Sequence, residues 1–194
     1  MAQHLPPHRI REIYDVVFAL VAEHGYANVR IDQIAKAAHT STATIYRHWG
    51  SKSKLVVGVL TADTHDEPDI DTGSLLGDLH AHVDAIGDDL PAAVRFLTSI
   101  ALAASDDEEL SRSYREHGVP VIRHSLDAAI ERAITRGELA ADHPAIAHLV
   151  PLLLAPHVVT RLLLMGTVTP ADTHAYIDSV IPPLLQLTPS PKAH

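Results

Sequence analysis

The stretch from His39 to Lys54, HTSTATIYRHWGSKSK, holds the side chains best suited to chemistry in this sequence. It combines threonine hydroxyls, imidazoles, a guanidinium and lysines with a tyrosine and a tryptophan. This mixture is too polar for a protein core and too apolar for a plain loop. Hydroxyl, guanidinium and imidazole groups hydrogen-bond to base edges and phosphates, so the stretch predicts a short helix that contacts nucleic acid.

The residues around this stretch predict four helices. Apolar residues recur every three or four positions over Pro7–His24, and Gly25 can end that helix in a left-handed conformation. A second, short helix is expected over residues 31–38 and a third over Thr42–Trp49. The apolar stripe that follows predicts a fourth helix over residues 52–63.

A tight turn at His39 and Thr40 joins the second and third helices, which predicts a helix-turn-helix. Ser41 can cap the third helix by accepting a hydrogen bond from a free backbone N–H. Ile45 and Trp49 are four residues apart, so both are expected to point into the core. The outward face is then expected to hold Ala43, Thr44, Arg47 and His48, with Thr42 and Tyr46 at its flanks.

The charge distribution favours a nucleic-acid partner for the N-terminal part. The net charge is −9, yet residues 1–54 hold seven Lys or Arg against four Asp or Glu, whereas the rest hold eight against twenty. A basic head on an acidic body indicates DNA binding, although an excess of three charges also arises by chance. Lys52 and Lys54 begin the fourth helix, where backbone N–H groups and a lysine suit a phosphate.

Composition excludes several other classes of protein. The 194 residues are 46% apolar and 20% charged, which suits one large folded domain or two small ones. With no cysteine, the chain has no disulfide, no cysteine metal ligand and no cysteine nucleophile. The N-terminus lacks a signal-peptide pattern, and prolines interrupt the most apolar run at residues 145–165. We therefore expect a cytoplasmic protein without a membrane span.

The segment IDQIAKAAHTSTATIYRHWGSKSKL resembles the DNA-binding head of the TetR family of bacterial transcriptional regulators. Close resemblance covers about residues 9–62. The matching positions are Ile34, Ala35, Ala38, Ser41, Thr44, Ile45, Tyr46, Trp49, Ser51, Lys52 and Leu55. The family usually has Gly where this chain has His39, at a site that tends to need a positive φ. It usually opens the second helix with Thr or Ser, where Arg30 here loses a cap but offers a phosphate contact.

The resemblance implies a set of DNA contacts on and around the third helix. They are Thr42, Ala43, Thr44, Tyr46, Arg47, His48 and Lys52, with Arg30 added. A purely structural role is the alternative for each. Tyr46 can pack against the first helix, and His48 can be a solvated surface residue. Arg47 and Lys52 can be ordinary exposed charges.

Beyond the head, the sequence predicts an all-α body. Residues 64–73, THDEPDIDTG, are acidic and contain Pro68 and Gly73, so they predict a linker. This linker divides a DNA-binding domain at residues 7–63 from a helical domain at residues 74–188. Helices of the second domain are expected at about residues 74–86, 90–104, 107–117, 120–136, 144–165 and 170–187.

The resemblance implies that the body binds a ligand and forms a homodimer through its last two helices. The sequence independently places one apolar face on each of them: Leu152, Ala155, Val159, Leu162 and Met165, then Tyr176, Val180, Leu184 and Leu187. Two such helices from each subunit would form a four-helix bundle. Packing within a single chain is the alternative.

Prolines inside the expected helices, such as Pro151 and Pro156, can kink them and open a cavity. Polar residues on apolar stretches are then candidate effector contacts: Thr98, His117, His124, His157, Thr160 and Arg161. A pocket in such surroundings is mostly hydrophobic, so the effector is expected to be small and largely apolar.

These features predict a ligand-responsive transcriptional regulator, a repressor that its effector releases from a palindromic DNA operator. No catalytic residue, cofactor or metal ligand is expected. The alternative function is a helical small-molecule-binding or metal-dependent enzyme that uses the C-terminal pocket. Fifteen histidines suggest it, but the sequence has no HExxH and no clustered metal signature.

Overall fold

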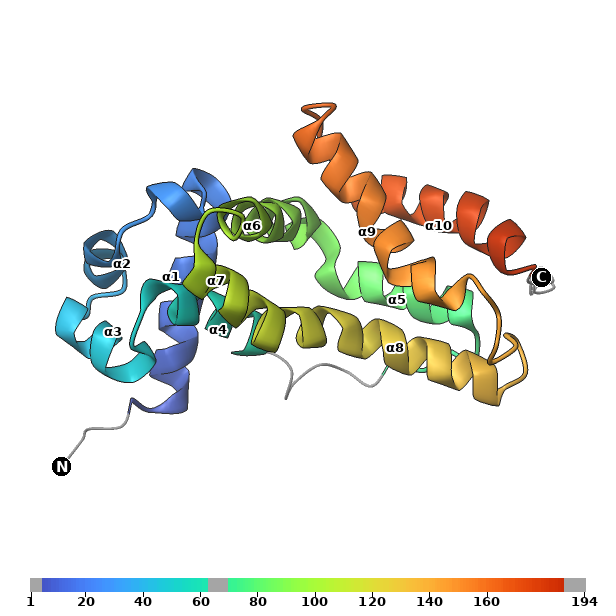
Figure 1. The fold of residues 1–194 in the computed structure, drawn as a ribbon, viewed down its shortest axis with the longest axis horizontal. Helices are drawn as coiled ribbons and strands as arrows, with labels where there is room; N and C mark the ends of the chain where they lie inside the picture. The colour runs from blue at the N-terminus through green and yellow to red at the C-terminus, as the bar shows by residue number, and fades with distance from the viewer. Residues whose placement is uncertain (1–4, 63–69, 187–194) are drawn as a thin grey trace. The chain divides into compact units, whose positions relative to one another are not determined.

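The computed structural model describes residues 5–62 and 70–186, and every regular element in these residues is helical, as the sequence predicts (Figure 1). None of the helices in these ranges is long and apolar enough to cross a membrane. The chain forms two compact units. The first comprises Met1–Glu67 and Ala92–Ile122, and the second comprises Pro68–Pro91 and Arg123–His194.

The first unit contains the helices around the candidate DNA-contacting residues. Its N-terminal elements are α1 (Pro7–His24), a 3-10 turn (Tyr26–Asn28), α2 (Ile31–Ala37), α3 (Thr42–Trp49) and α4 (Lys52–Ala62). It also contains most of α6 (Leu90–Ala103), α7 (Glu108–Ser113) and a π-helical turn (Tyr114–Gly118). The predicted bounds of the first and third helices are confirmed. The predicted end of the fourth at Asp63 lies outside the described residues.

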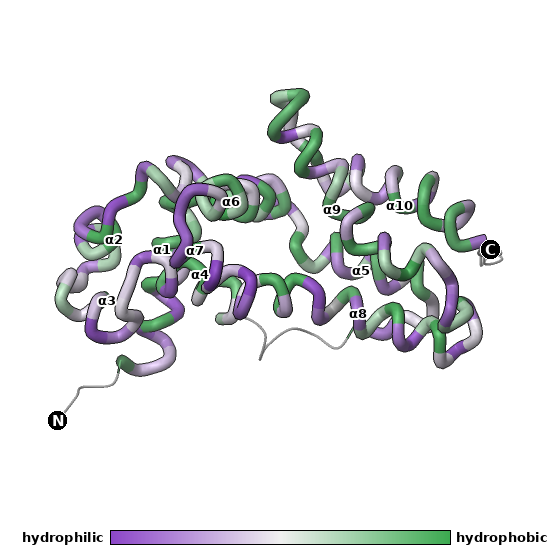
Figure 2. Tube along the Cα trace, viewed as in Figure 1, coloured by the Kyte–Doolittle hydropathy of each residue, from purple (hydrophilic) through white to green (hydrophobic). Residues whose placement is uncertain are grey.

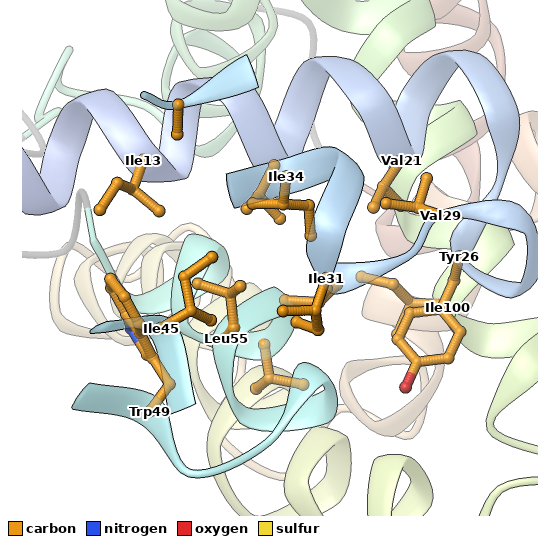
Figure 3. Close-up of a cluster of buried hydrophobic side chains, with 14 of the residues drawn as sticks. Ile13, Val21, Tyr26, Val29, Ile31, Ile34, Ile45, Trp49, Leu55 and Ile100 are labelled. Carbon is orange, nitrogen blue, oxygen red and sulfur yellow. The ribbon is translucent and has the colours of Figure 1, made fainter. Parts of the chain in front are cut away.

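One apolar core holds the first unit together, and α6 and α7 share it with the N-terminal helices. Its fully buried members visible in Figure 3 include Ile13, Ile34, Ile45, Leu55 and Ile100. Phe96 and Ile100 of α6 and Leu110 of α7 belong to the same cluster. The predicted linker at residues 64–73 therefore separates α6 and α7 in sequence from the helices against which they pack.

The structure differs from the predicted helix at residues 107–117. There α7 is short, and a π-helical turn leads from it into α8 (Val119–Thr135). Pro120 has no N–H to offer the carbonyl four residues earlier, which frees the preceding turn to widen. Gly118 fits this turn because a Cβ there would lie only 2.7 Å from the Tyr114 ring.

The second unit contains α5 (Leu75–Ile86), a 3-10 turn (Gly87–Asp89), most of α8, α9 (Ile146–Leu162) and α10 (Pro170–Leu185). The expected helix over residues 144–165 is shorter at both ends, and the chain turns away at Met165, whose φ is 53°. The expected last residue of the final helix, Leu187, lies outside the described residues.

A buried carboxylate fixes the start of the second unit. Asp78 on α5 is 0% exposed, and its Oδ1 accepts hydrogen bonds from the backbone N–H (2.7 Å) and hydroxyl (2.8 Å) of Thr72. Its Oδ2 lies 3.4 Å from Arg132 Nε and 3.5 Å from Arg136 Nη2. Burial raises the pKa of Asp78, but the Thr72 hydrogen bonds and the Arg132 charge outweigh it and hold that pKa below its ordinary value.

A pair of histidines links α5 to α10. The Nδ1 atoms of His80 and His174 are 2.5 Å apart, and the two rings are within 23° of parallel. Nε2 of His80 lies 2.9 Å from Asp178, and Nε2 of His174 lies 2.9 Å from Asp84. The contact between the Nδ1 atoms requires one ring to donate a proton and the other to accept it. This chain of four side chains fixes the register of α5 against α10.

The end of α9 exposes apolar side chains. Leu163, Leu164 and Met165 are 73%, 69% and 77% exposed, and Figure 2 colours the end of α9 as hydrophobic. In the predicted dimer face Val159, Met165 and Leu184 are exposed, whereas Leu152, Ala155, Leu162, Tyr176 and Val180 are half-buried. Exposed apolar patches mark interaction surfaces, so the end of α9 is a candidate interface.

We expect Asp78→Asn to lower the free energy of unfolding by about 2–3 kcal/mol, because it leaves the half-buried guanidinium of Arg132 without its carboxylate partner. The pKa of Asp78 is depressed in the folded state, so its contribution is present above the pKa of the unfolded chain. That contribution is lost as the pH falls through the folded-state pKa. Urea unfolding at neutral and acidic pH measures both effects. Asp88→Asn, an exposed control, should change neither. An equal acid sensitivity of wild type and Asp78→Asn would contradict the assignment.

Candidate nucleic-acid interface

The inner face of α3 anchors the helix in the core of the first unit. Ile45 is 0% exposed and Trp49 is 9% exposed, which confirms the prediction that both point inward. The Trp49 indole Nε1 donates a hydrogen bond of 2.9 Å to the Tyr14 hydroxyl on α1. The two rings meet edge to face, with centroids 5.8 Å apart. These contacts fix which side of α3 faces away from the protein.

The outward face of α3 carries the predicted DNA-contacting side chains. Thr42, Ala43 and Arg47 are exposed, and Tyr46 is 52% exposed. Thr44 is half-buried, and its hydroxyl lies 2.9 Å from that of Ser41. The face is therefore centred on Thr42, Ala43, Tyr46 and Arg47.

His48 is half-buried at the edge of this face, and its ring centroid lies 4.3 Å from that of Trp49. The predicted outward position of Thr44 and His48 is thus only partly correct. Each directly precedes an inward-facing residue, Ile45 or Trp49, and so lies on the flank of the helix.

Both ends of α3 have defined caps. The Ser41 hydroxyl accepts a hydrogen bond of 3.0 Å from the Thr44 N–H, as predicted. At the other end Gly50 has a φ of 82°, and its N–H bonds to the Tyr46 carbonyl. A helix of eight residues is too short to be stable alone, so these caps and the buried face must hold it.

The turn before α3 contains a non-glycine residue in the left-handed region. His39 has a φ of 49°, which confirms that the site requires a positive φ. The guanidinium of Arg9 on α1 donates to two carbonyl oxygens of this turn, those of Ala38 and His39, the latter at 3.1 Å. Arg9 therefore joins the first helix to the turn.

Arg30 precedes α2 and is exposed. Its guanidinium bonds in a bidentate manner to Asp32, with both N···O distances at 3.0 Å. As predicted, the N-terminus of α2 has no side-chain acceptor from this residue. The Gln33 Oε1 compensates in part because it accepts a hydrogen bond of 2.8 Å from the Arg30 backbone N–H.

At the start of α4 the structure turns Lys52 toward Tyr26. The Lys52 ammonium donates to the Tyr26 carbonyl at 2.6 Å and lies 3.9 Å from the centre of its ring. Burial lowers the pKa of Lys52. The Tyr26 hydroxyl lies 3.0 Å from the buried Ser53 hydroxyl and donates at 3.3 Å to Asp107, the N-cap of α7. Ser99 of α6 accepts from the Tyr26 N–H at 2.5 Å. Tyr26 thus links α1, α4, α6 and α7.

The candidate effector contacts fall into both compact units. In the first unit, Thr98 is buried and its hydroxyl donates to the Val94 carbonyl at 2.7 Å, whereas His117 is exposed. In the second unit, His124 and Arg161 are exposed and Thr160 is half-buried.

His157 is the one of these six with a buried polar atom that lacks a partner. It is 8% exposed, and its Nδ1 makes no hydrogen bond. Burial lowers the pKa of His157, which favours the neutral ring. A buried imidazole nitrogen without a partner is costly to the fold, so it is a candidate contact for a ligand.

No three His, Asp or Glu side chains within residues 5–62 and 70–186 are arranged to hold a metal ion. The sequence reasoning missed Arg9, Tyr14 and Tyr26, which hold the turn, α3 and α4 in place. Their partners lie about 26 to 35 residues away in sequence, so no local pattern identifies them.

Two family models match the chain. One, described as "Bacterial regulatory proteins, tetR family", matches residues 13–59, which include α2, the turn and α3. The other, described as "Tetracyclin repressor-like, C-terminal domain", matches residues 69–180, more than half of the chain.

Curated relatives and solved structures agree with these models. A DNA-binding transcriptional repressor, TetR, from Mycobacteroides abscessus is 31% identical over 172 residues, which cover 86% of this chain and 88% of the relative. The regulator AqdR from Rhodococcus erythropolis is 28% identical over 167 residues, which cover 84% and 79%. A TetR regulator from Agrobacterium tumefaciens superposes with a TM-score of 0.68 at 20% identity and covers 94% of each chain. GusR from Salmonella enterica gives 0.68 at 19% identity and covers 96% of this chain and all of its own. At these identities the solved structures show a shared fold.

The pKa of Tyr26 is raised to about 12, chiefly by burial, with a smaller contribution from the nearby Asp107 carboxylate. A raised folded-state pKa means that the stability it contributes is present below pH 10 and is lost as the pH rises toward 12. We expect the free energy of unfolding to fall over this interval in the wild type and less steeply in Tyr26→Phe. The variant should also lose about 1 kcal/mol at neutral pH through its missing hydrogen bonds. Denaturant unfolding across this pH range, with Tyr46→Phe as the exposed control, measures both. Parallel curves for wild type and Tyr26→Phe would refute the expectation.

Proposed function

This chain belongs to the TetR family of bacterial regulatory proteins and is a DNA-binding transcriptional regulator, and we propose that it is a repressor. In this proposal it represses transcription from a palindromic operator until a small, largely apolar effector releases it. Residues 7–63 form the DNA-binding domain in this proposal, and residues 74–188 bind the effector and dimerise. Because operator DNA lies in the bacterial cytoplasm, the protein acts there.

The observation that carries the proposal is the outward face of α3. Burial of Ile45 and Trp49 leaves Thr42, Ala43 and Arg47 exposed on a short helix that follows a tight turn. Such a helix lies in the major groove, where a guanidinium and hydroxyls bond to base edges or phosphates and an alanine allows close approach. Tyr46, which is exposed beside Arg47, and His48 at the edge of the face are assigned to the backbone of the DNA.

Two further cations are assigned to phosphates. Arg30 lies at the start of α2, and its guanidinium is bonded to the Asp32 carboxylate. A DNA phosphate must therefore compete with that carboxylate. Lys52 uses one N–H for the Tyr26 carbonyl and keeps two for a phosphate. Both contacts are electrostatic and carry no sequence information, so they should affect all duplexes alike.

One α3 reads only a few base pairs, so a homodimer is needed to reach both halves of a palindrome. We assign the interface to α9 and α10. The strongest support is the exposed apolar segment Leu163, Leu164 and Met165 at the end of α9. The Val158 and Val159 side chains, 42% and 41% exposed, extend this surface along the helix.

The effector is assigned to the second domain, where His157 offers a buried nitrogen to a ligand that is otherwise apolar. Effector binding shifts the dimer to a spacing of the two α3 helices that no longer matches half-sites about 34–36 Å apart. α4 acts as the lever because it follows α3 directly in sequence. The curated relatives are transcriptional regulators, so the enzyme alternative is not favoured.

We expect Arg47→Ala to weaken binding to an operator duplex selected by the wild type from a random library, by about 1–3 kcal/mol. If Arg47 contacts a base, the preference at one position relaxes; if it contacts a phosphate, the slope of log K against log salt falls by about 1. Fluorescence anisotropy at several salt concentrations measures both. Arg112→Ala, which removes an equal charge from α7, is the control. Failure of the wild type to select any duplex, or unchanged binding by Arg47→Ala, would refute the assignment of α3.

We expect Leu163→Glu to weaken dimerisation at least about tenfold, since a buried charge replaces an apolar contact at the interface. Sedimentation equilibrium gives the dissociation constant directly. Ala85→Glu places the same charge at an exposed position on α5, outside the assigned interface, and should leave the constant unchanged. Equal constants for Leu163→Glu and wild type would remove the end of α9 from the interface.

A further inference from the structure

The turn between α2 and α3 has two features that require support. His39 adopts a φ of 49°, a conformation that costs a residue with a Cβ about 1–2 kcal/mol. The carbonyl oxygens at the end of a short helix also lack partners within the helix. Backbone hydrogen bonds supply part of this support. The Thr40 N–H bonds to the Ala35 carbonyl at 2.8 Å, and the His39 N–H bonds to the Lys36 carbonyl at 3.2 Å.

Arg9 supplies the rest from a different helix. Its Nη2 donates to the carbonyls of both Ala38 and His39, which belong to two successive peptide units of the turn. Its Nη1 donates to the Glu12 Oε2 at 2.5 Å, one turn along α1. A guanidinium is planar, so partners on two of its nitrogens fix its orientation. The side chain is only 26% exposed.

Arg9 supports the turn that leads into α3, and a second side chain of α1 contacts α3 itself. This second contact is the Tyr14 hydroxyl, which accepts from the indole of Trp49 at the last turn of α3. One contact therefore lies just before α3 and the other at its end, and both come from a single eighteen-residue helix. A rigid helix held at both ends can change its angle only if one contact breaks.

We propose that Arg9 is a positioning residue for operator binding, which holds the turn at Ala38 and His39 so that α3 enters the major groove at a fixed angle. This role rests on the proposed function of α3 as the DNA-reading helix. Arg9 acts through the turn and does not itself contact a phosphate. Its effect is on specific recognition, because only base contacts depend on the exact direction of α3, whereas phosphate contacts tolerate small rotations.

Three substitutions separate this role from a phosphate contact. Arg9→Ala removes both the planar, forked guanidinium and its charge. Arg9→Lys keeps the charge, which serves a phosphate, but its single ammonium cannot reproduce the planar fork between Glu12 and the turn. Arg11→Ala removes an equal charge from the same helix and serves as the matched control. Binding is measured by anisotropy, at several salt concentrations, with the duplex selected by the wild type and with a scrambled duplex.

We expect Arg9→Ala and Arg9→Lys each to weaken specific binding about tenfold, the effect of losing one to two charge-assisted hydrogen bonds. Binding to the scrambled duplex and the slope of log K against log salt should stay at the wild-type values. A slope lower by about 1 in Arg9→Ala, together with wild-type affinity of Arg9→Lys for the selected duplex, would identify a phosphate contact and overturn the proposal. So would a loss in Arg9→Ala no greater than that in Arg11→Ala.

A rescue experiment separates positioning from general destabilisation. Glycine adopts a positive φ without strain, so in a His39→Gly background the turn needs less support from Arg9. We expect the fold loss of affinity caused by Arg9→Ala to be less than half as large in that background. Loss of affinity that tracks the unfolding midpoint and is not reduced by His39→Gly would refute the proposal. Failure of the proposed function is recognised separately, because the wild type would then select no duplex or Arg47→Ala would bind normally.

Discussion

Burial of Ile45 and Trp49 in the core of the first unit is the interaction on which the DNA-binding surface depends. Truncation of a fully buried isoleucine typically costs about 2–5 kcal/mol, far more than an eight-residue helix gains from its own hydrogen bonds. The rotation of α3 about its axis is therefore set by these two side chains. Ala43 and Arg47 lie on the opposite face because of the helical period alone. Sequence variation on that face can change which DNA is recognised without altering the fold.

Tyr26 provides a physical connection between this surface and the rest of the first unit. It joins the end of α1 to Lys52 and Ser53 at the start of α4, and to Ser99 and Asp107 at α6 and α7. A displacement of α6 or α7 would have to break hydrogen bonds of a buried tyrosine or carry α4 along. Buried polar networks of this kind are costly when only partly satisfied, which favours movement of the joined elements together.

Local signals in the sequence were sufficient to predict most helix boundaries. Gly25 and Gly50 end helices with φ values of 81° and 82°, and Ser41 caps α3, because turn and cap chemistry depends on single residues. The helical period also identified the two buried residues of α3. The family resemblance implied DNA binding, and the matched family models bear it out.

Long-range contacts could not be predicted in this way. Nothing in the sequence near α6 shows that Phe96 and Ile100 pack into the core of the N-terminal helices. No local pattern indicates that the ammonium of Lys52 also donates a hydrogen bond to the Tyr26 carbonyl, 26 residues earlier. The π-helical turn before α8 depends on how Tyr114 packs over Gly118, which is again a matter of tertiary structure.

His39, where the family usually has glycine, affects how firmly the turn between α2 and α3 is held. Glycine would adopt the required φ without strain, but it would also leave the turn free to adopt many other conformations. Histidine restricts the backbone, and therefore lowers the entropy that the unfolded turn must lose, at the cost of a strained native φ. The two hydrogen bonds from Arg9 stabilise the conformation that the histidine alone disfavours. With histidine at this position, the turn between α2 and α3 therefore depends on Arg9 for its native conformation. For a helix that must fit a groove of fixed width, a turn held in one conformation is an advantage that offsets the strain.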